Sequence, residues 1–183
     1  MIKYILLIFT GFFLGNCSLK NPTEFSKEAL NDTFISFGIK NQNQNQNQNQ
    51  NKTEREIERE EVLFKDILSQ NKGKKIVIDV WASWCKDCLE SLPDVKKLQA
   101  ENPTVVFVYL SLDKDLESWE TAVHRLNLKG QHYFMQSGWE GKFAKFLGVN
   151  WIPRYLLIAE NGAITVFNET KITDDFIGKI LKK

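Results

Sequence analysis

The sequence contains few of the residues from which metal clusters and disulfide scaffolds are built. Its 183 residues include only three cysteines and two histidines, too few for a disulfide-stapled domain or a multinuclear metal site. It also lacks an excess of charge, because 24 Lys and Arg face 23 Asp and Glu. A net charge of +1 creates no strong field of one sign, so nucleic acid is disfavoured as a partner. The positions of the three cysteines therefore carry most of the functional information.

A run long enough to span a bilayer is also absent from the N-terminus. After Lys3, the mostly apolar run of about ten residues to Leu14 is too short for a helix across ~30 Å of hydrocarbon, but it fits the core of an export signal. The following Leu14-Gly15-Asn16-Cys17 resembles the bacterial lipobox. The resemblance implies a signal peptide over residues 1–16, lipidation of Cys17 and anchoring to a membrane of the bacterial cell envelope. The alternatives are an ordinary signal peptide and an uncleaved anchor.

Residues 17–52 are predicted to be a tether that precedes the folded domain. Within them, Asn41 to Asn51 alternates Asn and Gln and offers no apolar side chain to bury, so it is expected to be a disordered spacer. The apolar segment Thr33 to Ile39 is dense enough for a short strand or docking segment. The domain itself is expected to cover residues 53–183.

The pattern of the domain predicts an α/β fold with a mixed sheet covered by helices on both faces. A charged segment with an apolar stripe predicts a helix from Thr53 to about Gly73. Glu160-Asn161-Gly162 is a turn signal between two strands of a hairpin. The other expected elements are strands at 75–82, 104–112, 152–158 and 163–167, and helices at 85–100, 116–126, 139–147 and 173–183.

The segment Trp84-Cys85-Lys86-Asp87-Cys88 lies where a buried strand gives way to a helix. At a helix N-terminus, free backbone N–H groups and the helix dipole stabilise a thiolate on the first cysteine. Such a pair can attack a substrate disulfide through Cys85 and resolve the mixed disulfide through Cys88. Lys86 favours the thiolate and Asp87 opposes it, so the direction of electron flow stays open.

Longer stretches around this motif resemble the thioredoxin fold, and within it the membrane-anchored thiol-disulfide oxidoreductases of the TlpA and ResA type. The resemblance runs from about Phe64 to the C-terminus, and its strongest parts are 73–88, 147–158 and Asn161-Gly162. It implies that Pro153 is in cis beside the active disulfide and that the backbone of Ile152 pairs with an incoming peptide next to Trp84. It also implies a TlpA-type insertion at 116–136.

Asp79 matches the buried acid that relays a proton to the resolving thiol in thioredoxins. Desolvation should raise the pKa of a carboxyl buried at the end of such a strand, which suits acid–base work. The alternative is a paired structural Asp. Relatives often carry Glu three residues after the second cysteine, where this chain has Ser91 and places its acid at Glu90, whose role stays open.

The resemblance implies a reductant or disulfide exchanger for exported proteins. Its partners would be protein thiols and disulfides of the cell envelope and an upstream membrane electron donor. No cofactor other than the Cys85–Cys88 disulfide is expected.

Three other readings of the motif are open. A metal site would need His124 and His132, but their spacing exceeds the usual three to five residues, so no metal is predicted. A thiol peroxidase would need an upstream Thr and Pro that are missing. A redox-inert module could use the fold only to bind peptides. Among the tryptophans, only Trp84 is expected at the site, and the others are expected to be core or groove residues: Trp81, Trp119, Trp139 and Trp151.

Overall fold

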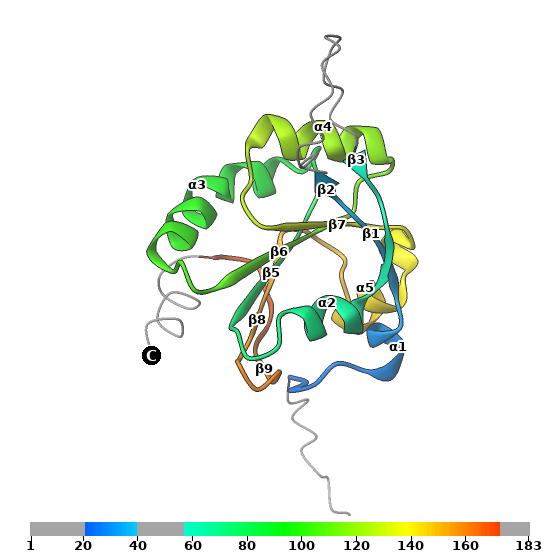
Figure 1. Cartoon of the computed structure of the whole chain (residues 1–183), viewed down its shortest axis with the longest axis vertical. Coiled ribbons are helices and arrows are strands. Elements are labelled where there is room, and N and C mark those ends of the chain that lie inside the picture. Colours follow the sequence, from blue (N-terminus) through cyan, green and yellow to red (C-terminus); the bar gives the residue numbers. More distant parts are fainter. Residues whose placement is uncertain (1–20, 40–56, 173–183) are drawn as a thin grey trace, which may run out of the picture.

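A seven-stranded mixed sheet forms the centre of the computed structural model, which describes residues 21–39 and 57–172 (Figure 1). The strand order is β4-β1-β7-β6-β5-β8-β9, and β2 and β3 form a separate antiparallel pair. The strands are β1 (Thr33–Ser36), β2 (Gly38–Ile39), β3 (Ile57–Glu58), β4 (Glu61–Leu63), β5 (Ile76–Trp81), β6 (Val106–Ser111), β7 (Gln131–Met135), β8 (Arg154–Ile158) and β9 (Ile164–Glu169).

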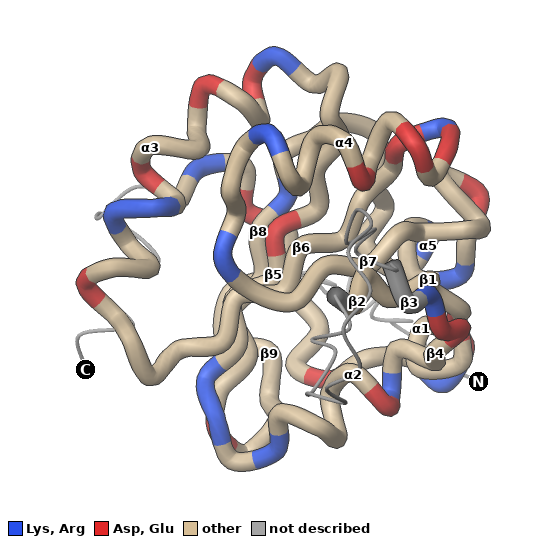
Figure 2. The backbone as a smooth tube through the Cα atoms, turned by 45° about the horizontal axis from the view of Figure 1, so that its top comes forward, with Lys and Arg blue, Asp and Glu red and all other residues tan. Residues whose placement is uncertain are grey.

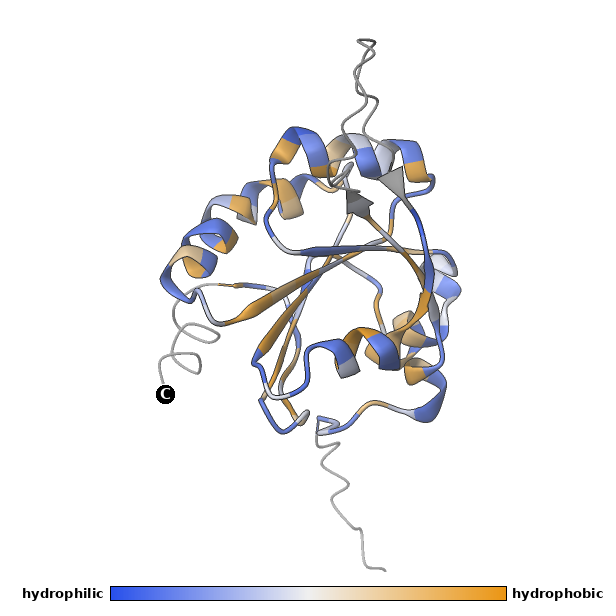
Figure 3. Ribbon diagram, in the orientation of Figure 1, coloured by the Kyte–Doolittle hydropathy of each residue, from blue (hydrophilic) through white to orange (hydrophobic). Residues whose placement is uncertain are grey.

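The middle of the sheet is parallel and its ends are antiparallel. β5 pairs with β6 and β6 with β7 in parallel, whereas β8 runs antiparallel to both β5 and β9. All six residues of β5 are buried, as expected for a mainly apolar strand covered on both faces. Apolar residues concentrate along these central strands (Figure 3). The predicted α/β fold, the two buried strands and the C-terminal hairpin are confirmed.

Helices cover both faces of the sheet (Figure 1), and acidic and basic residues are interspersed along the chain (Figure 2). They are α1 (Lys27–Leu30), α2 (Phe64–Gln70), α3 (Lys86–Glu101), α4 (Leu116–Leu126) and α5 (Lys142–Leu147), with a 3-10 turn η1 (Gly138–Glu140) before α5. On one face, Lys96 and Gln99 of α3 donate to carbonyls at the end of α4 and just after it. On the other face, the rings of Phe64 in α2 and Phe143 in α5 pack together, with their centroids 4.5 Å apart.

The expected helix from Thr53 to Gly73 is wrong in its first half. Helix α2 begins only at Phe64, and the charged segment before it forms β3 and β4. Strand β4 pairs with β1, with Val62 opposite Phe34. The helical spacing of apolar residues was a local signal, and pairing with a distant strand overrides it.

The expected domain boundary at residue 53 is also wrong, because part of the predicted tether belongs to the domain. Strand β1 lies inside the sheet between β4 and β7, so the apolar segment from Thr33 is a strand, one of the two roles considered for it. Strands β2 and β3 pair with Gly38 opposite Glu58. The Asn/Gln tract therefore belongs to a connection between two paired strands, and it does not link an anchor to the domain.

Several predictions fall outside the described residues. They are the signal peptide over 1–16, the lipidation of Cys17, the disorder of Asn41 to Asn51 and the helix at 173–183. Within residues 21–39 and 57–172, no helix has both the length and the apolar character needed to cross a membrane. The helix and strand expected at 116–136 are present as α4 and β7, and their origin as a TlpA-type insertion stays a prediction.

Asp32 ties the N-terminal segment to the rest of the fold. Its buried carboxylate accepts hydrogen bonds from the Ser137 hydroxyl (3.1 Å) and from the backbone N–H of Phe143 (2.9 Å). Gly141 lies so close that an added Cβ would approach the Asp32 carboxylate to 2.8 Å. One side chain thus fixes both ends of the η1 turn against β1.

We predict that Asp32→Ala lowers the free energy of unfolding by about 3 kcal/mol, because it leaves the buried N–H of Phe143 without an acceptor. Urea unfolding followed by circular dichroism measures the change. Asp94→Ala removes an exposed carboxylate on α3 and serves as the control, with an expected change below about 0.5 kcal/mol. Equal midpoints for Asp32→Ala and the control would contradict the prediction.

Candidate active site

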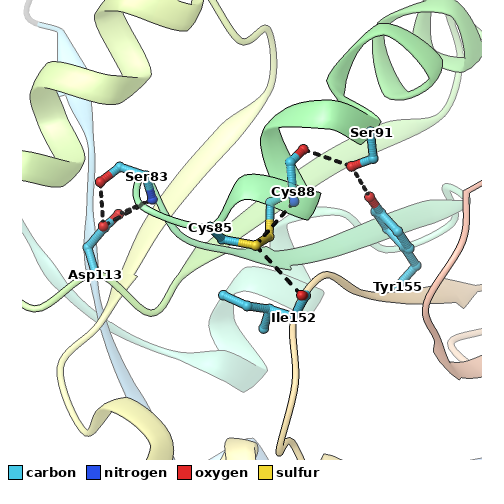
Figure 4. The surroundings of a disulfide bond; sticks show 7 residues. All are labelled: Ser83, Cys85, Cys88, Ser91, Asp113, Ile152 and Tyr155. Carbon is cyan, nitrogen blue, oxygen red and sulfur yellow. Dashed lines mark hydrogen bonds between the residues drawn. A yellow bond between two sulfur atoms is a disulfide. The ribbon is translucent and has the colours of Figure 1, made fainter.

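Antiparallel pairing of β5 and β8 brings the motif and Pro153 together. Because Val80 lies opposite Arg154, the end of β5 that leads to Cys85 meets the start of β8 that follows Pro153. The sulfur of Cys85 lies 3.6 Å from the carbonyl oxygen of Ile152 (Figure 4). The Ile152–Pro153 peptide bond is cis, as the resemblance implies.

Cys85 and Cys88 form a disulfide whose Cα atoms are 5.3 Å apart. Cys85 is the N-cap residue of α3, and its sulfur accepts a hydrogen bond from the backbone N–H of Cys88 at 3.1 Å. When the disulfide is reduced, this donor and the positive end of the helix dipole favour a thiolate on Cys85. Cys85 also lines a surface cleft and Cys88 does not, so an incoming thiol or disulfide reaches Cys85 first.

A buried carboxylate holds the loop that precedes Cys85. Asp113, which follows β6, accepts hydrogen bonds from both the N–H and the hydroxyl of Ser83, the latter at 2.6 Å (Figure 4). It also accepts from the Ser111 hydroxyl at 2.7 Å. The sequence analysis missed Asp113, although an acid directly after a buried strand was a usable signal. The hydrogen bonds to Asp113 fix the loop between β5 and α3, the redox helix that begins after Cys85.

Asp79 lies in β5 and is buried, with 2% of its surface exposed. Its Oδ1 atom has no hydrogen-bond partner among the described residues. Burial raises the pKa of the Asp79 carboxyl to about 8, as the sequence predicts in direction and cause. In the sheet, Asp79 lies opposite Tyr109 on one side and Tyr155 on the other. Burial, followed by the charge of Asp79, raises the pKa of both tyrosines.

The hydroxyl groups of Tyr155 and Ser91 link strand β8 to Cys88 (Figure 4). The Ser91 hydroxyl lies 2.8 Å from the carbonyl oxygen of Cys88 and 2.8 Å from the hydroxyl of Tyr155. Since Ser91 donates its one proton to the carbonyl, Tyr155 donates to Ser91. Ser91 stands three residues after Cys88, at the position where the resemblance leads one to expect Glu. Glu90 lies at the surface instead, 3.5 Å from Lys86.

His132 lies in β7 opposite Tyr109 of β6, the strand neighbour of Asp79. The two rings are stacked, with their centroids 4.9 Å apart. Burial lowers the pKa of His132 to about 4, so the ring is neutral at pH 7, and its Nε2 lies 3.1 Å from the carbonyl oxygen of Leu128. It is a strand residue as expected, but β7 is an inner strand and not an edge. Across 21–39 and 57–172 no group of three or more His, Cys, Asp or Glu side chains is arranged to hold a metal ion.

The cleft at the disulfide has a volume of about 340 Å³. Its lining residues are Trp84, Cys85, Lys86, Asp87, Trp139, Asn150, Trp151 and Ile152. Trp139 and Trp151 have the groove role that was one of the two expected for them, and they line the cleft together with Trp84. Trp139 and Trp151 are 37% and 59% exposed, whereas Trp81 and Trp119 are core residues as expected.

Comparisons with known proteins agree with this geometry. The profile of the Redoxin family matches residues 66–176. A candidate thiol-disulfide oxidoreductase from Bacteroides vulgatus is similar at 35% identity and a TM-score of 0.55, covering 62% of this chain and 75% of that one. A thiol-disulfide oxidoreductase from Bacteroides fragilis is similar at 25% identity and a TM-score of 0.53, covering 61% and 82%.

Curated relatives match over shorter stretches. The thiol:disulfide interchange protein DsbE of Yersinia pestis is 33% identical over 93 residues, which are 50% of this chain and 47% of that protein. The thioredoxin-like protein YneN of Bacillus subtilis is 46% identical over 37 residues, 20% and 22% of the two chains. The chain thus spans about half or less of the length of these relatives.

Burial of Asp79 predicts a pH-dependent stability. The pKa of its carboxyl is raised in the folded state and ordinary, near 3.9, in the unfolded state, so the folded state binds the proton more tightly between about pH 4 and 8. This contribution to stability is lost as the pH rises through that window. The gain in unfolding free energy from Asp79→Asn should therefore grow by up to about 1.4 kcal/mol per pH unit.

Urea unfolding of the oxidised protein at pH 5 and pH 8 measures this difference. Asp94→Asn, at an exposed carboxylate of α3, is the matched control, and its difference from wild type should stay constant between the two pH values. The prediction fails if the Asp79→Asn difference is also constant.

Proposed function

The chain belongs to the redoxin family, and we propose that it is a thiol-disulfide oxidoreductase that exchanges disulfides with exported proteins through Cys85 and Cys88. The observation that carries the proposal is the position of the disulfide. Its first cysteine, Cys85, is the N-cap residue of α3 and lines the cleft. The sulfur of Cys85 also lies next to the carbonyl of Ile152, which precedes the cis proline. The thioredoxin-like fold and the oxidoreductases among its relatives support the same assignment.

The proposed exchange proceeds in two balanced steps. In the reducing direction, the Cys85 thiolate attacks one sulfur of a substrate disulfide, and the other substrate sulfur leaves as a thiolate that takes up a proton. The Cys88 thiol then loses its proton, attacks the sulfur of Cys85 and releases the second substrate thiol. The protein ends as the disulfide and the substrate as a dithiol, a transfer of two electrons. The oxidising direction reverses both steps.

Asp79 is the proposed proton acceptor for Cys88 in the second step. A base is most useful when its pKa lies near the working pH, and burial raises the pKa of this carboxyl to about 8. The hydroxyls of Tyr155 and Ser91 hydrogen-bond to each other, and Ser91 also donates to the carbonyl of Cys88, so they position the turn that carries the Cys88 thiol. In the reverse direction, the protonated Asp79 would return the proton to the Cys88 thiolate.

The proposed setting is the bacterial cell envelope. The soluble secreted antigen MPT53 of Mycobacterium bovis, 26% identical to this chain over 97 residues, supports this placement. We propose lipidation of Cys17 as the membrane attachment. The partners would be thiols and disulfides of envelope proteins, and a dithiol donor in the membrane would reduce the Cys85–Cys88 pair again after each turnover.

We predict that Cys85→Ser abolishes insulin reduction, because no nucleophile reaches the cleft, whereas Cys88→Ser accumulates mixed disulfides that cannot be resolved. Non-reducing gel electrophoresis after acid quenching detects the trapped species. The double variant Cys85→Ser/Cys88→Ser is the control and should trap nothing. An unaltered insulin-reduction rate in Cys85→Ser would remove the oxidoreductase proposal and leave a redox-inert peptide-binding module.

A second prediction concerns the resolution step. In the wild type, the rate at which Cys88 releases a preformed mixed disulfide should rise with pH through about 8, as Asp79 loses its proton. Asp79→Asn should slow release by about 100-fold and remove this pH dependence. Rapid-quench measurement of thiol release gives both quantities.

Alkylation of Cys85 by iodoacetamide is the control for this experiment, because it reports the first nucleophile without the resolution step. Its rate should change far less than the release rate in Asp79→Asn. A release rate and pH profile equal to wild type would instead make Asp79 a structural carboxyl.

A further inference from the structure

We propose that Trp139 and Trp151 are specificity residues that select substrates in which a large apolar side chain neighbours the reacting cysteine. This inference rests on the proposed function, since it assigns the substrate class of the same disulfide. The substrate would be an exported polypeptide that has not yet folded. The argument starts from where the aromatic side chains of the described residues lie.

Three large hydrophobic side chains are exposed in the described part of the chain, and all three line the cleft at the disulfide. They are Trp84, Trp139 and Trp151, exposed by 54%, 37% and 59%. Each comes from a different segment: the loop after β5, the η1 turn and the loop before β8. Exposed apolar side chains that gather at one place mark an interaction site, whereas isolated ones need no explanation.

The two segments that carry Trp139 and Trp151 are held in place by contacts within the fold, before a substrate binds. On the Trp151 side, Gly148 ends α5 with a φ of +60°, and Arg154 donates a hydrogen bond to the side chain of Asn150 at 2.9 Å. On the Trp139 side, Asp32 binds Ser137 and the N–H of Phe143, on either side of the turn. A preformed aromatic surface loses little conformational entropy on binding, so its contacts contribute to affinity.

The size and charge of the cleft define its occupant. A volume of about 340 Å³ is near the lower end for ligand sites, roughly 300–1,000 Å³, so it accommodates one or two side chains and no folded domain. Its two charged lining residues, Lys86 and Asp87, have opposite signs, and Lys86 also lies 3.5 Å from Glu90. With no net charge in the lining, three indole rings favour a neutral, apolar side chain beside the cysteine.

Such a cysteine is accessible mainly in a chain that is not yet folded. Large apolar residues are among those most often buried in native proteins, so a disulfide flanked by them is covered once folding is complete. A cleft that needs both the cysteine and its apolar neighbour therefore discriminates against native disulfides. The structure thus points to the exchange of disulfides in non-native envelope proteins.

The test uses the full-length reduced protein and synthetic peptides, each with one cysteine in a mixed disulfide with thionitrobenzoate. The residue on each side of the cysteine is Phe, Ser or Lys. The wild type should react with the Phe peptide about tenfold faster than with the Ser peptide, as the partial burial of a phenyl ring implies. In Trp139→Ala/Trp151→Ala this ratio should fall to about one.

Two comparisons make the result specific. Trp139→Phe/Trp151→Phe keeps aromatic walls and should retain most of the selectivity, and thermal unfolding of each variant reports whether the fold is intact. Glu117→Ala, an exposed substitution on α4 outside the cleft lining, should leave the ratio at the wild-type value.

The outcomes separate this inference from the proposed function. If the wild type reacts with oxidised glutathione but shows a Phe-to-Ser ratio near one, the inference fails and the oxidoreductase proposal stands. If the Lys peptide reacts fastest, the indole rings bind a cationic side chain and not an apolar one, which would also overturn the inference. If the wild type reacts with neither glutathione nor any peptide, the proposed function itself fails.

Discussion

The antiparallel pairing of β5 with β8 is the constraint on which the site depends. Cys85 and Pro153 are far apart in sequence, and they meet because one follows the end of β5 while the other precedes the start of β8. The same register sets Asp79 beside Tyr155, and Tyr155 then reaches Ser91 on the helix that Cys85 caps. The nucleophile, the peptide-facing loop and the buried acid are thus positioned by one ladder of backbone hydrogen bonds.

Burial of this ladder makes the charged form of Asp79 unfavourable. Asp79 lies in a fully buried strand, where its charged form is disfavoured, and one of its oxygens has no partner among the described residues. A structural Asp in such a position is usually paired or hydrogen-bonded, because an unpaired buried charge destabilises the fold. Asp79 therefore differs from a typical structural Asp in having an unpartnered oxygen among the described residues, which is compatible with the proposed role of proton acceptor.

The sequence was informative wherever the signal was local and weak wherever a distant partner decided the outcome. The β-branched run before Trp81, the apolar spacing of α4 and the Asn161-Gly162 turn predicted their elements correctly. The segment before Phe64 has helical spacing, yet it is a strand because β1 lies beside it. Asp113 offered a local signal, an acid directly after a buried strand, whereas Trp139 and Trp151 are brought to the cleft by the assembled fold. The cis bond before Pro153 was foreseen through the resemblance, since few X-Pro bonds are cis.

The corrected start of the domain changes how a lipid anchor would act. The carbonyl of Thr23 accepts a hydrogen bond from the N–H of Ile164 at 2.8 Å, and Cys17 lies only six positions before Thr23, so the chain between them reaches at most about 22 Å. The Asn/Gln tract cannot extend this reach, because it lies between the paired strands β2 and β3. If Cys17 is lipidated as proposed, the domain therefore stays close to the membrane. The segment nearest the anchor also carries Asp32, which holds the η1 turn and thus the Trp139 wall. The segment next to the anchor would then also support the Trp139 side of the cleft and, with it, the proposed selection of substrates.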